Sequence, residues 1–190
     1  YGEQGNGVVF DLPIAFFELI FNINNPREIY LLRHLLNFLL FFTSVFFFYK
    51  IIKNRYNSYL TGIIGAAFLV LSPRIFAQSF YNTKDIFLMS LFIINIYTAI
   101  NFLEKPNLKT AIIFSLISSL VTDVRILGIF LPALIFLIYI INILRDNNFS
   151  KEKILPLIFF LISLPFLIVL FWPYLWANPV ENFIEVFRNL

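Results

Sequence analysis

The sequence lacks cysteine altogether and carries few charged side chains. Its 190 residues contain no Cys, which excludes disulfide bonds, thiolate metal ligands and a cysteine nucleophile. Charged residues make up only 13% of the chain, against about 25% in soluble proteins, whereas hydrophobic residues make up 60%. The net charge of +3 is small and the basic residues form no single block, so nucleic acid is not an expected partner. The composition indicates a protein whose main solvent is the lipid bilayer.

Apolar runs of membrane-spanning character dominate the rest of the chain. A helix needs about 20 apolar residues to cross the hydrocarbon core of a bilayer. We therefore expect an all-α polytopic transmembrane bundle, in which the second run can continue towards Phe80 and the second and fourth are short. An apolar stretch at 8–23, interrupted by Asp11 and Pro13, predicts a helix that lies in the membrane interface instead. The six expected spans are 29–52, 59–71, 86–103, 110–121, 126–144 and 154–172.

The distribution of charge between the loops predicts the orientation. If all six runs cross, one side receives eight basic and three acidic side chains, a net charge of +5. The other side receives six basic and eight acidic side chains, a net charge of −2. Because short cytoplasmic loops are enriched in Lys and Arg, the first side is expected to be cytoplasmic. Trp172, Tyr174 and Trp176 then cluster where the last span emerges outside, as expected for an aromatic belt.

The predicted organisation is one transmembrane domain over 1–190. It comprises an external interfacial segment at 1–28, six spans within 29–172 and an external segment at 173–190. The chain opens without Met on a polar stretch, YGEQGNG, shows no signal-peptide pattern and ends within an amphipathic segment. We expect it to be a fragment of a longer integral membrane protein of the bacterial inner membrane, inactive alone.

Polar residues gather at the outer ends of the expected spans, and each has a structural interpretation beside a functional one. Arg33 can snorkel to the headgroups, and His34 is more readily a hydrogen-bonded packing residue than a metal ligand. Lys84 and Asp85 can form a helix start, with Asp85 near the positive end of the helix dipole. The candidates also include Arg74 beside the second span and, between the fourth and fifth spans, Asp123 and Arg125, which can be a solvated turn with a weak ion pair.

Taken together, these residues favour an enzyme acting at one face of the membrane. Two short turns each combine an Asp with a basic residue, and both are expected on the same side. A transporter more often carries its polar residues near the midplane of the bilayer. Basic side chains can hold a phosphate, and a carboxylate can act on a hydroxyl or bind a metal. This chemistry suits sugar transfer from a polyprenyl-phosphate donor anchored in the membrane.

The motifs resemble those of GT-C type membrane glycosyltransferases, which include protein O-mannosyltransferases and aminoarabinose transferases. In that group a span ends in Ser-Pro, a short external segment follows and an Asp opens the next span. LSPRIFAQSFYNTKDIFL, with Ser72-Pro73 and Asp85, is similar to this arrangement. LVTDVRILGIFLPAL and FWPYLWANP are similar to later segments of the same group, although many members have Lys at the position of Asp123.

The resemblance implies transfer of a sugar from a polyprenyl-phosphate-linked donor to a lipid, glycan or protein hydroxyl on the outer face, with inversion. Asp85 then orients the acceptor or binds a divalent metal ion. Lys84, Arg74 and Arg125 are the phosphate-binding candidates, and Asp123, His34 and Arg33 are weaker candidates for substrate binding. The catalytic base is expected on an external loop upstream of residue 1, with Glu3 and Asp11 as poor substitutes.

Two other classes of protein remain open at this point. A transporter or flippase would carry polar residues across the midplane and a pathway open to both sides. A non-catalytic membrane scaffold would hold the two Asp-containing turns far apart. An outward cavity lined by Lys84, Asp85, Asp123 and Arg125 would favour the enzyme.

Overall fold

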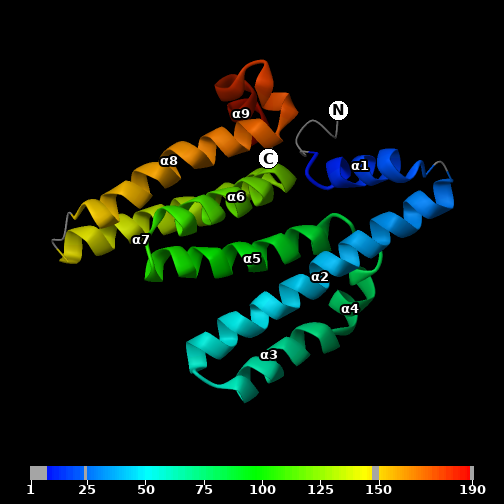
Figure 1. Ribbon diagram of the computed structural model, residues 1–190, viewed down its shortest axis with the longest axis horizontal. Coiled ribbons are helices and arrows are strands. Elements are labelled where there is room, and N and C mark those ends of the chain that lie inside the picture. Colours follow the sequence, from blue (N-terminus) through cyan, green and yellow to red (C-terminus); the bar gives the residue numbers. More distant parts are fainter. Residues whose placement is uncertain (1–7, 24, 147–149, 189–190) are drawn as a thin grey trace. The chain divides into compact units, whose positions relative to one another are not determined.

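All regular secondary structure in the described residues is helical, which confirms the predicted all-α fold class. The computed structural model describes residues 8–23, 25–146 and 150–188 (Figure 1). The elements in chain order are α1 (Asp11–Phe21), α2 (Pro26–Tyr56), α3 (Tyr59–Leu71), α4 (Pro73–Ser79), α5 (Asp85–Glu104), α6 (Leu108–Val124), η1 (Ile126–Ile129), α7 (Phe130–Asp146), α8 (Lys151–Phe171), η2 (Pro173–Trp176) and α9 (Pro179–Arg188).

Local sequence signals set the ends of several helices. The Asn25 side chain accepts a hydrogen bond from the backbone N–H of Arg27, and Pro26 opens α2 where its missing N–H costs nothing. At the start of α6, Asn107 and Thr110 form a reciprocal capping box. Asn57 ends α2 in the left-handed conformation at φ 49°, which Asn tolerates better than most residues.

Among the described residues, four helical segments are long and apolar enough to cross a membrane, namely Pro26–Tyr56, Asp85–Glu104, Ile126–Arg145 and Lys151–Phe171. A fifth crossing is possible if α3 and α4 count as one span, although they are bent by 70° at Ser72. The second predicted span therefore ends at Leu71 as expected, and its continuation towards Phe80 is a separate short helix. The fourth predicted span corresponds to α6, which has 17 residues and is not among the four, so its crossing stays a prediction.

The chain divides into two compact units, and the division falls within α5. One unit comprises Phe10–Tyr97, in which α2 and α3 pack side by side (Figure 1). Within it, α4 contacts both α2 and α3, and α1 contacts α2. The stretch 8–23 contains the helix α1, which buries Ile14 and leaves Leu19 and Phe21 among its exposed side chains, and its place in the membrane interface stays a prediction.

The other unit comprises Tyr1–Val9 and Thr98–Leu190, and its core lies between α6 and α8. The rings of Phe102, Phe114 and Phe160 lie within 5.7 Å of one another by their centroids. Ser163 of α8 donates a 2.8 Å hydrogen bond to the hydroxyl of Ser115 on α6. Small residues on a helix face allow such close approach, which is how membrane helices commonly associate.

One member of the expected aromatic belt lies inside the protein instead. Trp172 is 1% exposed and packs against Phe183 of α9, so it cannot anchor at the membrane surface as predicted. Trp176 is exposed and donates from its indole N–H to the carbonyl of Val169. The Tyr174 hydroxyl donates to Glu185 of α9, and this hydrogen bond raises the pKa of Tyr174. Trp172 is buried because α9 folds back over the end of the last span.

Candidate active-site region

In the turn between α4 and α5, hydrogen bonds to the Asn82 side chain fix the backbone at Lys84 and Asp85. The Asn82 side-chain oxygen accepts hydrogen bonds from the backbone N–H groups of Lys84, at 3.2 Å, and Asp85, at 2.9 Å. The Asn82 amide in turn donates to the Asp85 carboxylate at 3.2 Å. Asn commonly bonds to the backbone two or three residues ahead in this way. The helix start predicted at Asp85 is confirmed, and Asn82 is the residue that shapes it.

Two residues of α2 fix the end of α4 just before this turn. The Nδ1–H of His34 donates to the carbonyl oxygen of Phe80. The Asn37 amide, which is buried, donates to the carbonyl oxygen of Ser79 at 2.9 Å. Residues three apart share a face of a helix, so both side chains reach the same stretch of backbone. His34 is therefore a hydrogen-bonded packing residue, the first of the two interpretations given above.

Arg33, the neighbour of His34, forms an ion pair with α1. Its Nη1 lies 3.3 Å from Oδ1 of Asp11, and the two side chains are 42% and 60% exposed. A pair this exposed contributes little to stability, about 0 to 1 kcal/mol. Phe10, just before α1, packs its ring edge-to-face against Phe87 of α5. The start of α1 thus lies against α2 and the first turn of α5.

Arg74 and Lys84 are both exposed, as phosphate-binding side chains must be to meet a ligand. Arg74 is the second residue of α4 and follows the 70° break at Ser72. Helix α4 and the turn that follows it therefore carry two exposed cations, Arg74 and Lys84, and the exposed carboxylate of Asp85.

Asp123 belongs to the other unit, and its environment differs from the prediction. The side chain is 0% exposed, and one oxygen, Oδ2, accepts from the backbone N–H of Val9 at 3.0 Å. The other oxygen, Oδ1, is buried without a hydrogen-bond partner among the described residues. The interpretation as a solvated turn is therefore wrong for Asp123. No local pattern could have indicated this burial, since Val9 lies 114 positions away in the sequence.

The turn that follows Asp123 is tightly closed by a glycine. A Cβ on Gly128 would lie 2.8 Å from the backbone nitrogen of Thr122 and the carbonyl carbon of Val121. Arg125, at the junction of α6 and η1, is exposed. The turn thus holds a buried carboxylate and an exposed cation two residues apart.

The residues expected to act together thus belong to two different units. Lys84, Asp85 and His34 are brought to one turn, with Arg33 nearby on α2, while Asp123 and Arg125 lie in the second unit. A single cavity shared by both turns stays a prediction, and Glu3 lies outside the described residues. Sequence reasoning missed Asn82 and Asn37 as supporting residues. The signal for Asn82 was its position three residues before a helix start.

The part of the chain that the structure describes contains no cluster of acidic or histidine side chains that could bind a divalent metal ion. No group of three His, Asp or Glu side chains in that part could hold a metal ion. Among the described residues, Asp85 belongs to no such group, and the Asn82 side-chain oxygen already accepts from the backbone N–H groups of Lys84 and Asp85. We therefore derive no step through a metal.

The helices and the polar turns at their ends define a multi-pass integral membrane protein. The chain belongs to the dolichyl-phosphate-mannose-protein mannosyltransferase family, whose pattern matches residues 7–172. It is thus a membrane glycosyltransferase of the mannosyltransferase type, and the predicted resemblance is confirmed. No curated protein matches the chain, and no solved structure matches it either.

Proposed function

We propose that the protein transfers a sugar from a polyprenyl-phosphate-linked donor to a hydroxyl of a lipid, glycan or protein on the outer face of the membrane. The family's name gives dolichyl-phosphate-mannose as a donor and protein as an acceptor. The observation that carries the proposal here is the α4–α5 turn, where Asn82 holds Asp85 and Lys84 at the exposed end of a spanning helix. A carboxylate and a cation so placed suit a lipid-anchored donor whose sugar stands at the membrane surface.

In the proposed reaction, a carboxylate takes the proton of the acceptor hydroxyl, and the oxygen attacks the anomeric carbon in line. The bond between that carbon and the phosphate oxygen breaks, so the lipid phosphate departs and the anomeric configuration inverts. Asp85 orients the acceptor hydroxyl by accepting a hydrogen bond from it. Lys84 and Arg74 stabilise the charge that develops on the departing phosphate, which is the largest contribution expected of fixed cations.

The remaining predicted residues have supporting or secondary roles in this proposal. His34 acts as a positioning residue in this proposal, through its hydrogen bond to the Phe80 carbonyl, and it is a weaker candidate for substrate binding. Arg125 is a further phosphate-binding candidate. Asp123 and Arg33 are weaker candidates for substrate binding, since each already bonds to another part of the protein.

The test is to replace Asp85 by Asn in the complete protein. We expect transfer to fall by about 10²-fold or more, as for a group that handles a reacting hydroxyl, with expression and unfolding temperature unchanged. The matched control is Glu104→Gln, because Glu104 is the exposed acidic residue at the opposite end of the same helix. Sugar transfer from a radiolabelled polyprenyl-phosphate donor is measured for both variants. Normal transfer by Asp85→Asn would remove Asp85 from the reaction.

A further inference from the structure

The helix α9, which follows the last spanning helix, carries an exposed row of apolar side chains. Val180, Ile184 and Phe187 follow one another at intervals of four and three residues, so they share one face of the helix. Val180 is 71% exposed, and Ile184 and Phe187 are 45% and 43% exposed. We call these three residues the α9 stripe. A helix of ten residues with three charged side chains is too short and too polar to span a membrane.

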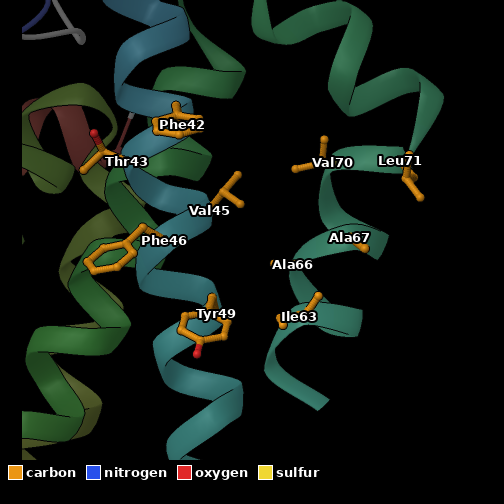
Figure 2. Close-up of a pocket in the computed structure, with 10 residues that line it drawn as sticks. All are labelled: Phe42, Thr43, Val45, Phe46, Tyr49, Ile63, Ala66, Ala67, Val70 and Leu71. Carbon is orange, nitrogen blue, oxygen red and sulfur yellow. The ribbon is translucent and has the colours of Figure 1, made fainter. Parts of the chain in front are cut away.

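Exposed apolar side chains are ordinary on a spanning helix, because the hydrocarbon of the bilayer surrounds it. Figure 2 shows an example on α2, an apolar groove in which Val45 faces Val70 of α3. On a short polar helix such as α9, a regular apolar row has a different meaning. It indicates a surface that meets either the lipid or another protein.

The other faces of α9 are fixed to its own unit. Phe183 packs against the core of that unit, and its ring centroid lies 6.4 Å from that of Trp172. On the polar side, Glu185 accepts from the Tyr174 hydroxyl at 2.9 Å, and the Asn182 amide donates to the Tyr174 carbonyl at 2.6 Å. These contacts hold the helix in one orientation and leave the α9 stripe outside the core.

The α9 stripe is continuous with an exposed apolar row on a spanning helix. The ring centroid of Phe187 lies 6.4 Å from that of Phe130, the first residue of α7. Phe130 opens a row of apolar side chains on one face of α7, each more than half exposed. The row consists of Phe130, Leu134, Leu137, Ile141 and Leu144. Because α7 forms most of the candidate span Ile126–Arg145, this row is expected to face hydrocarbon, and the same surface extends to α9.

Trp176 lies between the end of the last span and α9. Its ring is exposed, and its indole N–H donates to the carbonyl of Val169, in the last turn of α8, at 2.8 Å. The ring is thus held beside the end of the span, and Trp is enriched at the boundary between membrane and water. The polar side of α9 carries two glutamates against one arginine, so burial of apolar surface and not attraction to anionic lipid is the force available to hold α9 on a membrane.

We propose that α9 is an interfacial helix, whose α9 stripe lies in lipid at the boundary between headgroups and acyl chains of the leaflet in which α8 ends. Lipid is the partner that fits, because the α9 stripe joins the exposed row of α7 through Phe187 and Phe130. The inference does not depend on the proposed sugar transfer. It places α9, within the segment expected to be external, at the surface of the membrane.

The experiment measures the surroundings of a fluorescent label on α9 in the complete protein, reconstituted in phosphatidylcholine nanodiscs. Ile184→Cys and Val180→Cys introduce the label into the α9 stripe of a sequence that has no cysteine of its own. Quenching of an environment-sensitive fluorophore is compared between lipids that carry a nitroxide and iodide in the water. The matched control is Glu181→Cys, on the polar side of the same helix, and Leu134→Cys on α7 is the reference for lipid exposure. Unfolding temperatures verify that each variant is folded.

We expect nitroxide lipid to quench the labels at Ile184 and Val180 at a depth of about 5–10 Å into the boundary, with emission shifted to shorter wavelength. The label at Glu181 should be quenched by iodide and not by nitroxide lipid. If iodide quenches the labels of the α9 stripe as strongly as the label at Glu181, the stripe faces water and the proposal is overturned. Protection from both quenchers would overturn it too, because a protein surface would then cover the stripe. A label at Leu134 that escapes the nitroxide lipid would remove the continuity on which the proposal rests.

Discussion

At the scale of single residues, Asn82 fixes the backbone at the start of α5 and the position of the Asp85 carboxylate. Its side-chain oxygen bonds to two backbone N–H groups, and its amide bonds to the Asp85 carboxylate. We expect Asn82→Ala to lower the free energy of unfolding by about 1 kcal/mol, as for the loss of a helix cap, and to lower the rate of transfer as well. Asn82→Ser keeps a side-chain oxygen that can accept from the backbone N–H groups, without a negative charge beside Asp85, and should recover part of the stability. The measurements are thermal unfolding in detergent and sugar transfer, and equal behaviour of the two variants would contradict this role.

Residue roles were predictable where the signal is local and not where it depends on distant contacts. Asp85 was predicted to open a helix because an acidic residue is favoured at the positive N-terminal end of the helix dipole, and α5 begins at it. Asp123 was not predicted to be buried, because its burial and its bond to Val9 depend on how the chain returns after more than a hundred residues. His34 was ambiguous from sequence, since its partner is a backbone carbonyl that no residue type reveals.

At the scale of elements, the apolar runs predicted each long helix, since hydrocarbon demands helices with all backbone groups satisfied. The bend at Ser72 was not predictable as an angle, although Ser-Pro indicated that α3 stops there. The packing of α6 on η1 also required the structure, because it depends on a glycine in close backbone contact.

Two glycines of this chain should respond differently to the same substitution. Gly128→Ala meets the backbone of Val121 and Thr122, which cannot move aside, so we expect destabilisation by about 1–3 kcal/mol. Gly65→Ala closely meets only the terminal Cδ1 of the Ile52 side chain, which can rotate away. Alanine also favours the helix by up to about 1 kcal/mol over glycine, so Gly65→Ala should be nearly neutral. Thermal unfolding of both variants in detergent measures the difference, and equal losses would show that the α6–η1 contact is not rigid.

At the scale of the whole molecule, the open question is whether α6 crosses the membrane. Its 17 residues fall below the length of the four clear candidates, but the charge distribution favours its crossing. With six crossings, the loops near Asn57, Asn107 and Lys151 all lie on the basic side. Without the crossing of α6, the loop at Lys151 would lie on the opposite side and carry three basic residues there, against the usual enrichment of Lys and Arg in cytoplasmic loops.

The absence of cysteine makes this topology directly measurable, since single cysteines can be introduced without removing native ones. We expect Asn57→Cys, Asn107→Cys and Lys151→Cys to react with a membrane-impermeant maleimide only after the cytoplasmic side is made accessible. With six crossings, Asn178→Cys, between η2 and α9, should react from outside in intact cells. If Lys151→Cys reacts from outside in intact cells while Asn57→Cys, Asn107→Cys and Asn178→Cys do not, then α6 does not cross. The turn at Asp123 would then lie on the side opposite to Asp85, and the two could not line one outward cavity.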